Sequence, residues 1–247
     1  MRLLYLGSSI DTKGTVPDAE RRAHLGGEAL AAALGEPVTV TIKYIWPSER
    51  LPGKIDAWLD ETSPDLAVFH WSAWWCESLV VRRKVAPKLG PLAKPVDRAW
   101  LALRRSDRIT GTRAFRFANR VAMKTAGGAS PFAPAEAIPL VEASLRRMVR
   151  REDLAVCVLS TPFTALAGAG PARRAWATQR RDEAYRGLRP ILDQLHIPYF
   201  LPALEPDAFD TAWRDVDGLH LNAAAHRRCA DLELPALREA MRRHRAE

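Results

Sequence analysis

The sequence is poor in cysteine, with three among 247 residues, and these lie far apart. Cys76, Cys157 and Cys229 form neither a disulfide framework nor the paired spacing of a zinc site. The chain also lacks any apolar run of about 18 residues, so we expect no membrane-spanning helix. No apolar leader follows Met1, so we expect no signal peptide and a cytoplasmic location.

Acidic residues are outnumbered, 29 against 37 lysines and arginines, which gives a net charge of +8. Such an excess can indicate binding of nucleic acid, anionic lipid or an acidic substrate. The basic residues fall in separate short clusters with acidic residues between them, at 82–84, 104–105, 146–151, 180–181 and 242–245. This scatter favours solvated helix faces, and no nucleic-acid-binding motif is present. We therefore expect a small-molecule partner and no nucleic acid.

Apolar runs alternate with amphipathic stretches along the chain. Strands are predicted at residues 3–8, 38–45, 64–72, 154–160 and 199–201, and helices at 17–34, 54–61, 134–150, 172–195 and 222–244. This alternation predicts an α/β fold with a parallel sheet covered on both faces. Sites in such sheets lie beyond the carboxyl ends of the strands, which directs attention to residues 7–12, 45–48, 71–77 and 160–164.

Residues 77–130 interrupt this alternation of strands and helices. They contain three prolines, two arginine pairs and adjacent glycines at 127 and 128, but no clear strand. We interpret them as a helical insertion after the third strand of a single domain spanning 1–247. The insertion is either a lid over the site or a solvated decoration.

The segment "DGLHLN" places Asp217 three residues before His220, just ahead of the last predicted helix, which Asn222 can cap. A carboxylate beside Nδ1 of a histidine fixes its tautomer and stabilises the imidazolium, as in a catalytic triad. The alternative is a structural histidine near a helix start.

At the other end of the chain, "LYLGSSI" carries paired hydroxyls at the end of the first strand. Together, "LYLGSSI", "SPDLAVFHWSAWW" and "DGLHLN" resemble the blocks of the SGNH, or GDSL, hydrolase family, with Ser8 and Ile10 replacing the aspartate and leucine of Gly-Asp-Ser-Leu. The resemblance covers most of the chain except 77–130.

This resemblance implies a flavodoxin-like three-layer α/β/α sandwich and hydrolysis of ester or other acyl bonds. Ser9 would be the nucleophile, His220 the base and Asp217 the residue that orients His220. Ser8 would then be structural, either capping the turn or bonding nearby backbone. No cofactor or metal is expected.

Two features depart from the family. The oxyanion donors it normally supplies are a glycine after the second strand and an asparagine after the third, and both are missing from "YIWPSER" and "HWSAWWCES". The Ser72 hydroxyl or the Trp74 indole N–H could replace them. The departure leaves open a non-catalytic binding protein of the same fold, and an intact triad would also serve an acyltransferase.

Tryptophans gather at the predicted strand ends. Trp46, Trp71 and Trp75, with Trp74, could line a substrate pocket or pack beneath the insertion. His70 is expected to be buried rather than catalytic. Cys76 has no neighbouring histidine as a base, which argues against a thiol nucleophile.

Overall fold

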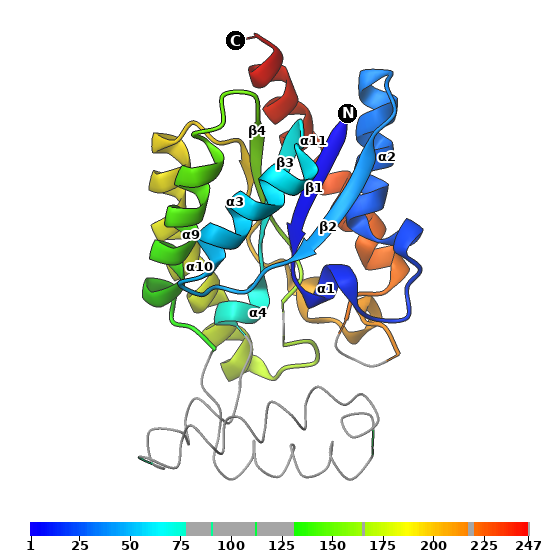
Figure 1. The fold of residues 1–247 in the computed structure, drawn as a ribbon. Helices are drawn as coiled ribbons and strands as arrows, with labels where there is room; N and C mark the ends of the chain where they lie inside the picture. Colours follow the sequence, from blue (N-terminus) through cyan, green and yellow to red (C-terminus); the bar gives the residue numbers. More distant parts are fainter. Residues whose placement is uncertain (78–89, 91–111, 113–130, 165, 217–219, 247) are drawn as a thin grey trace. The chain divides into compact units, whose positions relative to one another are not determined.

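The computed structural model describes residues 1–77, 90, 112, 131–164, 166–216 and 220–246. Within them, parallel strands form one sheet in the order β2-β1-β3-β4-β5 (Figure 1). The strands are β1 (Arg2–Gly7), β2 (Thr39–Tyr44), β3 (Leu66–Trp71), β4 (Ala155–Ser160) and β5 (Tyr199–Phe200). Every one of them falls inside a predicted range or within one residue of it.

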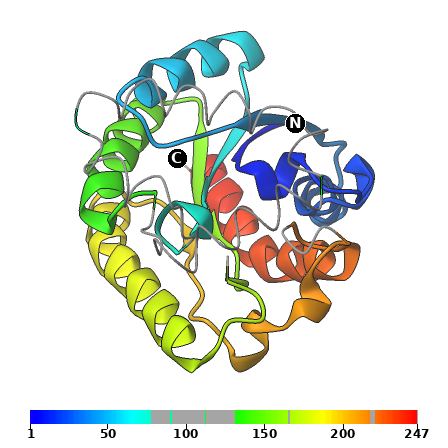
Figure 2. The same ribbon diagram turned by 90° about the horizontal axis from the view of Figure 1, so that it is seen from below.

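Helices cover both faces of this sheet. On one face α2 (Arg22–Leu34) packs against α11 (Ala223–Ala246), and on the other α9 (Pro134–Met148) lies between α3 (Leu51–Thr62) and α10 (Pro171–Gln194) (Figures 1 and 2). The strands β3 and β4 are buried along their whole length, as their continuous apolar sequences predict. The predicted three-layer α/β/α sandwich is confirmed.

The chain divides into two compact units, Met1–Glu77 with Pro134–Glu247, and Ser78–Ala133. The first unit contains the sheet and the helices named above. The insertion predicted at 77–130 falls on the second unit, and almost all of it lies outside the described residues.

The first long helix begins later than predicted. The sequence suggests a start at Pro17, but Asp18–Glu20 form a separate 3₁₀ turn, and Arg21 has extended backbone (φ −81°, ψ 146°) before α2 begins at Arg22. The predicted end is confirmed. Gly35 adopts a left-handed conformation (φ 70°), and its N–H donates to the Ala31 carbonyl at 2.9 Å.

Two short helices were not predicted. They are α1 (Ser9–Thr12) and α4 (Ala73–Cys76), which follow β1 and β3 directly. Four residues make about one turn, which is too short to carry a helical periodicity in sequence. Two 3₁₀ turns, Pro206–Phe209 and Thr211–Trp213, were missed for the same reason.

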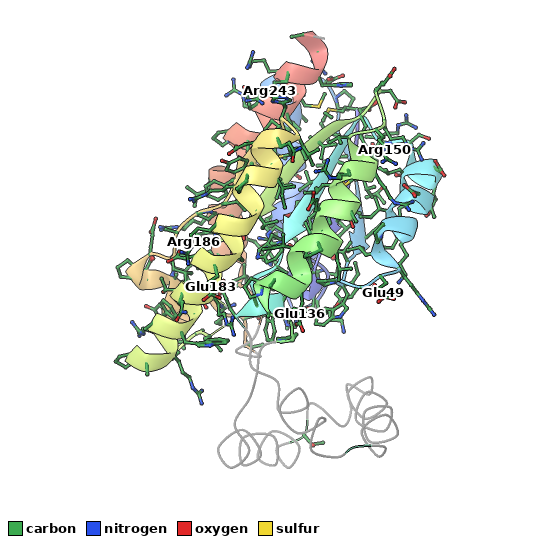
Figure 3. All side chains as sticks on the ribbon, turned by 90° about the vertical axis from the view of Figure 1, so that its left-hand side faces the viewer. Glu49, Glu136, Arg150, Glu183, Arg186 and Arg243 are labelled. Atoms are coloured by element: carbon green, nitrogen blue, oxygen red, sulfur yellow. The ribbon has the colours of Figure 1, made fainter. Side chains whose placement is uncertain are left out.

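The outer helix faces carry charges of both signs. Figure 3 shows Glu136, Glu183 and Arg186 on α9 and α10. Several arginines of the basic clusters pair with carboxylates, for example Arg180 with Glu183 at 3.0 Å. This agrees with solvated helix faces, and the absence of a nucleic-acid partner stays a prediction. No helix in the described part of the chain is long and apolar enough to cross a membrane.

A pair of charged residues is buried where α2 meets α11. Arg22 and Glu233 are 0% and 1% exposed, and Arg22 Nη1 donates to Glu233 Oε1 at 3.4 Å. Burial raises the pKa of Glu233 from 4.5 to about 8, although the Arg22 charge acts to lower it. This carboxyl therefore keeps its proton to a higher pH in the folded protein than in the unfolded chain.

We expect Glu233→Gln to gain stability relative to the unaltered chain as the pH rises. Because Glu233 ionises near 4.5 in the unfolded chain and near 8 in the folded protein, the folded state binds the extra proton between these values and loses stability as the pH rises through them. Glutamine does not ionise in the folded or the unfolded state, so the variant does not lose this stability. Urea unfolding at about pH 5 and about pH 8.5 should show the variant's advantage growing by about 1.4 kcal/mol or more, the equivalent of one pKa unit. An advantage that is equal at both pH values would contradict this expectation.

Candidate active site

The carboxyl ends of the central strands meet at one edge of the sheet. In the strand register Gly7 of β1 lies beside Tyr44 of β2, and Trp71 of β3 lies beside Ser160 of β4. The short helices α1 and α4 begin at this edge. The edge therefore gathers the segments that the sequence singled out.

The paired serines have different environments. Ser8 is 3% exposed and is the N-cap residue of α1, where its N–H donates to Asp11 Oδ2 at 2.6 Å. Ser9 is partly exposed and is the first residue of the helix. An N–H at that position has no acceptor within its own helix, so it is available to a ligand. This geometry supports Ser9 as the nucleophile and a structural role for Ser8.

His220 lies at the base of a loop that is closed by an antiparallel bridge between Arg214 and Leu221. The Asp215 N–H donates to the His220 carbonyl at 2.9 Å, and His220 is 8% exposed. Asn222 caps α11 as predicted, because its Oδ1 accepts the Ala225 N–H at 3.0 Å. The loop end and the helix start thus fix the backbone of His220.

Two contacts bring the His220 segment to the Ser9 segment. Ile10, directly after Ser9, packs in one buried cluster with Leu221, directly after His220. In addition, Gly14 has φ +102°, and a Cβ added there would lie 3.1 Å from the His220 Cβ. The turn that follows α1 therefore passes against His220, and this approach requires glycine.

Two aspartates could orient His220. Asp217 lies outside the described residues, so its role stays a prediction. Asp215 lies close enough to His220 for their charges to interact, and it also binds the backbone around it. Its carboxylate accepts the Thr15 N–H at 2.5 Å, the Thr15 hydroxyl at 2.6 Å and the Val216 N–H at 2.7 Å. Burial alone would raise the pKa of Asp215, but these hydrogen bonds hold it below its ordinary value. Asp215 thus ties the loop to Thr15, and the assignment of Asp217 as the acid stays a prediction.

Both proposed oxyanion donors are buried, the Ser72 side chain and the Trp74 indole Nε1 alike. Ser72 is 0% exposed, and its Oγ accepts the Trp74 N–H at 3.4 Å. This bond gives Ser72 a role in capping α4, and its action as a direct oxyanion donor stays a prediction. Trp74 is partly buried and packs against the cluster that holds Ile10 and Leu221. Of the two predicted donors, Trp74 is therefore the one beside the Ser9 and His220 segments.

We expect Trp74→Phe to lower kcat by about 10-fold or more, a loss of about 1.4 kcal/mol or more of transition-state stabilisation. Phenylalanine keeps an aromatic ring in the cluster but removes the indole N–H donor. If that donor acts on the developing negative charge, KM should change little. Steady-state kinetics on an ester substrate measures both constants, and an unchanged kcat would exclude the Trp74 indole as a donor.

The predicted pocket tryptophans divide into two groups. Trp71 and Trp75 are 2% and 0% exposed, and their rings meet edge to face with centroids 5.3 Å apart. They are core residues, so their assignment as pocket walls is corrected. Trp46 is 40% exposed and lies near Tyr44, which is 47% exposed and was not singled out from the sequence. These two rings remain candidates for contact with a substrate.

His70 is buried, as expected, and Cys76 is buried as well. Burial lowers the pKa of His70 well below 6.5, and its Nδ1 lies 3.3 Å from Arg22 Nη2. Burial raises the pKa of the Cys76 thiol to about 12, so it carries no thiolate at neutral pH. Among the described residues, no group of three or more histidine, cysteine, aspartate or glutamate side chains could hold a metal ion.

Sequence reasoning missed Asp11. Its buried carboxylate bonds the Ser8 backbone, in the turn where the resemblance leads one to expect an aspartate at position 8. The available signal was the spacing Ser8-x-x-Asp11, which is the pattern of a helix-capping box.

No family model matches the chain, and no curated protein matches it. Similar folds occur among solved structures. TesA is 15% identical, with 97% of this chain and 99% of TesA covered and a TM-score of 0.55. The psychrotrophic esterase EstA from Pseudoalteromonas sp. is 11% identical, with 98% of each chain covered and a TM-score of 0.52. Axe2, an acetylxylan esterase from Geobacillus stearothermophilus, is 15% identical, with 96% and 93% covered and a TM-score of 0.52. These similarities confirm the fold that the resemblance implied.

Proposed function

We propose that this chain is a serine hydrolase that cleaves ester or other acyl bonds through Ser9, His220 and Asp217. The observation that carries the proposal is the placement of Ser9 at the start of a helix, at the edge of the sheet where the strands' carboxyl ends meet, with the His220 segment packed against the same turn. Its fold is also that of solved esterases.

The chemistry follows from these positions. Ser9 Oγ attacks the carbonyl carbon of the substrate while His220 takes its proton, and Asp217 holds the imidazole in the required tautomer. The tetrahedral intermediate collapses when His220 returns that proton to the leaving alcohol. Water, activated by His220, then releases the acid from the acyl-enzyme.

The developing negative oxygen needs hydrogen-bond donors. The first is the N–H of Ser9, which as the first residue of α1 has no acceptor inside the helix. The second is the Trp74 indole. This pair replaces the glycine and asparagine that the sequence lacks.

A series of p-nitrophenyl esters with acyl chains of increasing length tests the proposal. We expect saturable hydrolysis with a preferred chain length, and we expect a fluorophosphonate to abolish it. Adding a range of alcohols to the same reaction identifies an acyltransferase by ester exchange that outpaces hydrolysis. The absence of turnover and of inhibition by the fluorophosphonate would instead support a binding protein of this fold.

A further inference from the structure

Helix α1, which begins at Ser9, is too short to be stable alone. It has four residues, and nucleating a single turn costs more than that turn returns. Its position must come from contacts with the rest of the protein. Ile10 supplies one contact through the buried cluster that includes Leu221. Asp11 supplies another.

The Asp11 side chain folds back over the end of β1. It is fully buried, and its Oδ2 accepts the Ser8 N–H at 2.6 Å. A Cβ added to Gly7 would lie only 2.7 Å from this oxygen, so the arrangement requires glycine there. The carboxylate thereby fixes the backbone that leads into Ser9. It also places a buried negative charge within one helical turn of the nucleophile.

Arg22, the first residue of α2, balances this charge. It is fully buried, and its Nε donates to Asp11 Oδ1 at 2.5 Å, while Nη2 forms an ion pair with the same oxygen. The preceding Arg21 donates to the Asp11 carbonyl at 3.4 Å. Two consecutive arginines thus hold both the side chain and the backbone of Asp11.

Three further elements of the core hold Arg22 itself. Nη2 lies 3.3 Å from Nδ1 of His70 on β3, and Nη1 donates to Glu233 on α11 at 3.4 Å. The guanidinium carbon lies 6.0 Å from the centroid of the Tyr5 ring on β1. The Arg22 backbone N–H donates to His226 Nδ1 at 3.3 Å. Arg22 therefore connects the short helix to the neighbouring strands β1 and β3 and to α11.

We propose that Arg22 is a positioning residue, which holds Ser9 and its N–H in the reactive geometry through the buried carboxylate of Asp11; this rests on the hydrolase function proposed above. The ion pair acts in two ways. It holds in place a helix that is not stable by itself. It also neutralises the Asp11 carboxylate, which would otherwise oppose the negative charge that develops at the reacting oxygen.

The test compares Arg22→Met and Arg22→Lys in the full chain, with p-nitrophenyl acetate and a fluorophosphonate as probes. We expect Arg22→Met to lower both kcat and the labelling rate by about 100-fold, as for loss of an oxyanion donor, with KM changed less than about 3-fold. Arg22→Lys keeps the cation beside Asp11 and should recover about 10-fold of that loss. A purely structural role would reduce the amount of folded protein without this split between kcat and KM.

Glu233→Gln is the matched control. The hydrogen bonds of Asp11 go to Ser8, Arg21 and Arg22, whereas Glu233 bonds Arg22 alone, and glutamine keeps a side-chain oxygen that can accept from Arg22. We expect its kcat to stay within about 3-fold of the unaltered enzyme. A loss as large as that of Arg22→Met would overturn the proposal, because the effect would then belong to the core in general.

Asp11→Asn removes the same ion pair by changing its acidic partner. It replaces Arg22→Met in the test if that variant does not fold. We expect kcat to fall by about 10-fold or more with KM nearly constant. If the unaltered enzyme is active and these substitutions leave kcat unchanged, only the positioning role is overturned. An unaltered protein that neither hydrolyses the ester nor reacts with the fluorophosphonate would overturn the proposed function as well.

Discussion

Ser9→Ala should reduce ester hydrolysis by roughly 10⁴–10⁶-fold, because removing the nucleophile of a triad eliminates the acyl-enzyme route and leaves only the background of binding and oxyanion stabilisation. The helix start should survive the change, since Ser8 and Asp11 form the cap and the Ser9 side chain makes no capping bond. Initial rates with p-nitrophenyl acetate, at matched folded-protein concentration, measure the loss.

Ser8→Ala is the matched control for this experiment. It removes a neighbouring hydroxyl of the same size, but the backbone N–H that Asp11 accepts remains in place. Loss of an N-cap side chain costs about 0.5–2 kcal/mol of stability, so the variant should melt earlier and keep a measurable fraction of its activity. If Ser8→Ala were inactive and Ser9→Ala active, Ser8 would be the nucleophile and the assignment to Ser9 would be wrong.

Asp217→Asn should lower kcat by up to about 10⁴-fold without unfolding the protein, because an asparagine favours the wrong tautomer of the catalytic histidine. The contrasting variant is Asp215→Asn. The Asp215 carboxylate accepts two hydrogen bonds from Thr15 and one from the Val216 N–H, so its loss should reduce the melting temperature in addition to any effect on rate.

Comparing kcat with melting temperature for the two variants separates their roles. A large rate loss in Asp217→Asn at an unchanged melting temperature is the expected result. The assignment of the acid would be wrong if Asp215→Asn lost kcat by that amount at an unchanged melting temperature while Asp217→Asn stayed active.

The sheet was predictable because its strands carry a strong signal. Buried parallel strands are continuous apolar runs, and the runs that end at Gly7, Trp71 and Ser160 are bounded by polar or turn-forming residues. The end of α2 was predictable for a similar reason, since Gly35 is the residue type that a left-handed C-cap favours.

The structures that form the site were harder to predict. Helices α1 and α4 have four residues each, and tertiary contacts, rather than propensity, determine them. Burial of Ser72, Trp71 and Trp75 depends on which side chains pack over the strand ends, and the sequence around them looks the same for a pocket and for a core.

The Asp11–Arg22 pair was also not predictable from the sequence. In sequence both are ordinary charged residues in a loop and at a helix start, where charge normally indicates solvent. Only the fold shows that they are fully buried and face each other. The capping-box spacing from Ser8 identifies Asp11 as structural, but nothing local indicates its partner.

The central claim is that Ser9 is an activated nucleophile. The most direct test is to treat the unaltered protein with a fluorophosphonate and to locate the adduct by peptide mass spectrometry. The account predicts one adduct per chain, on Ser9, which forms quickly and is abolished in His220→Ala. An adduct on another residue, or none under conditions that label a known serine hydrolase, would contradict it.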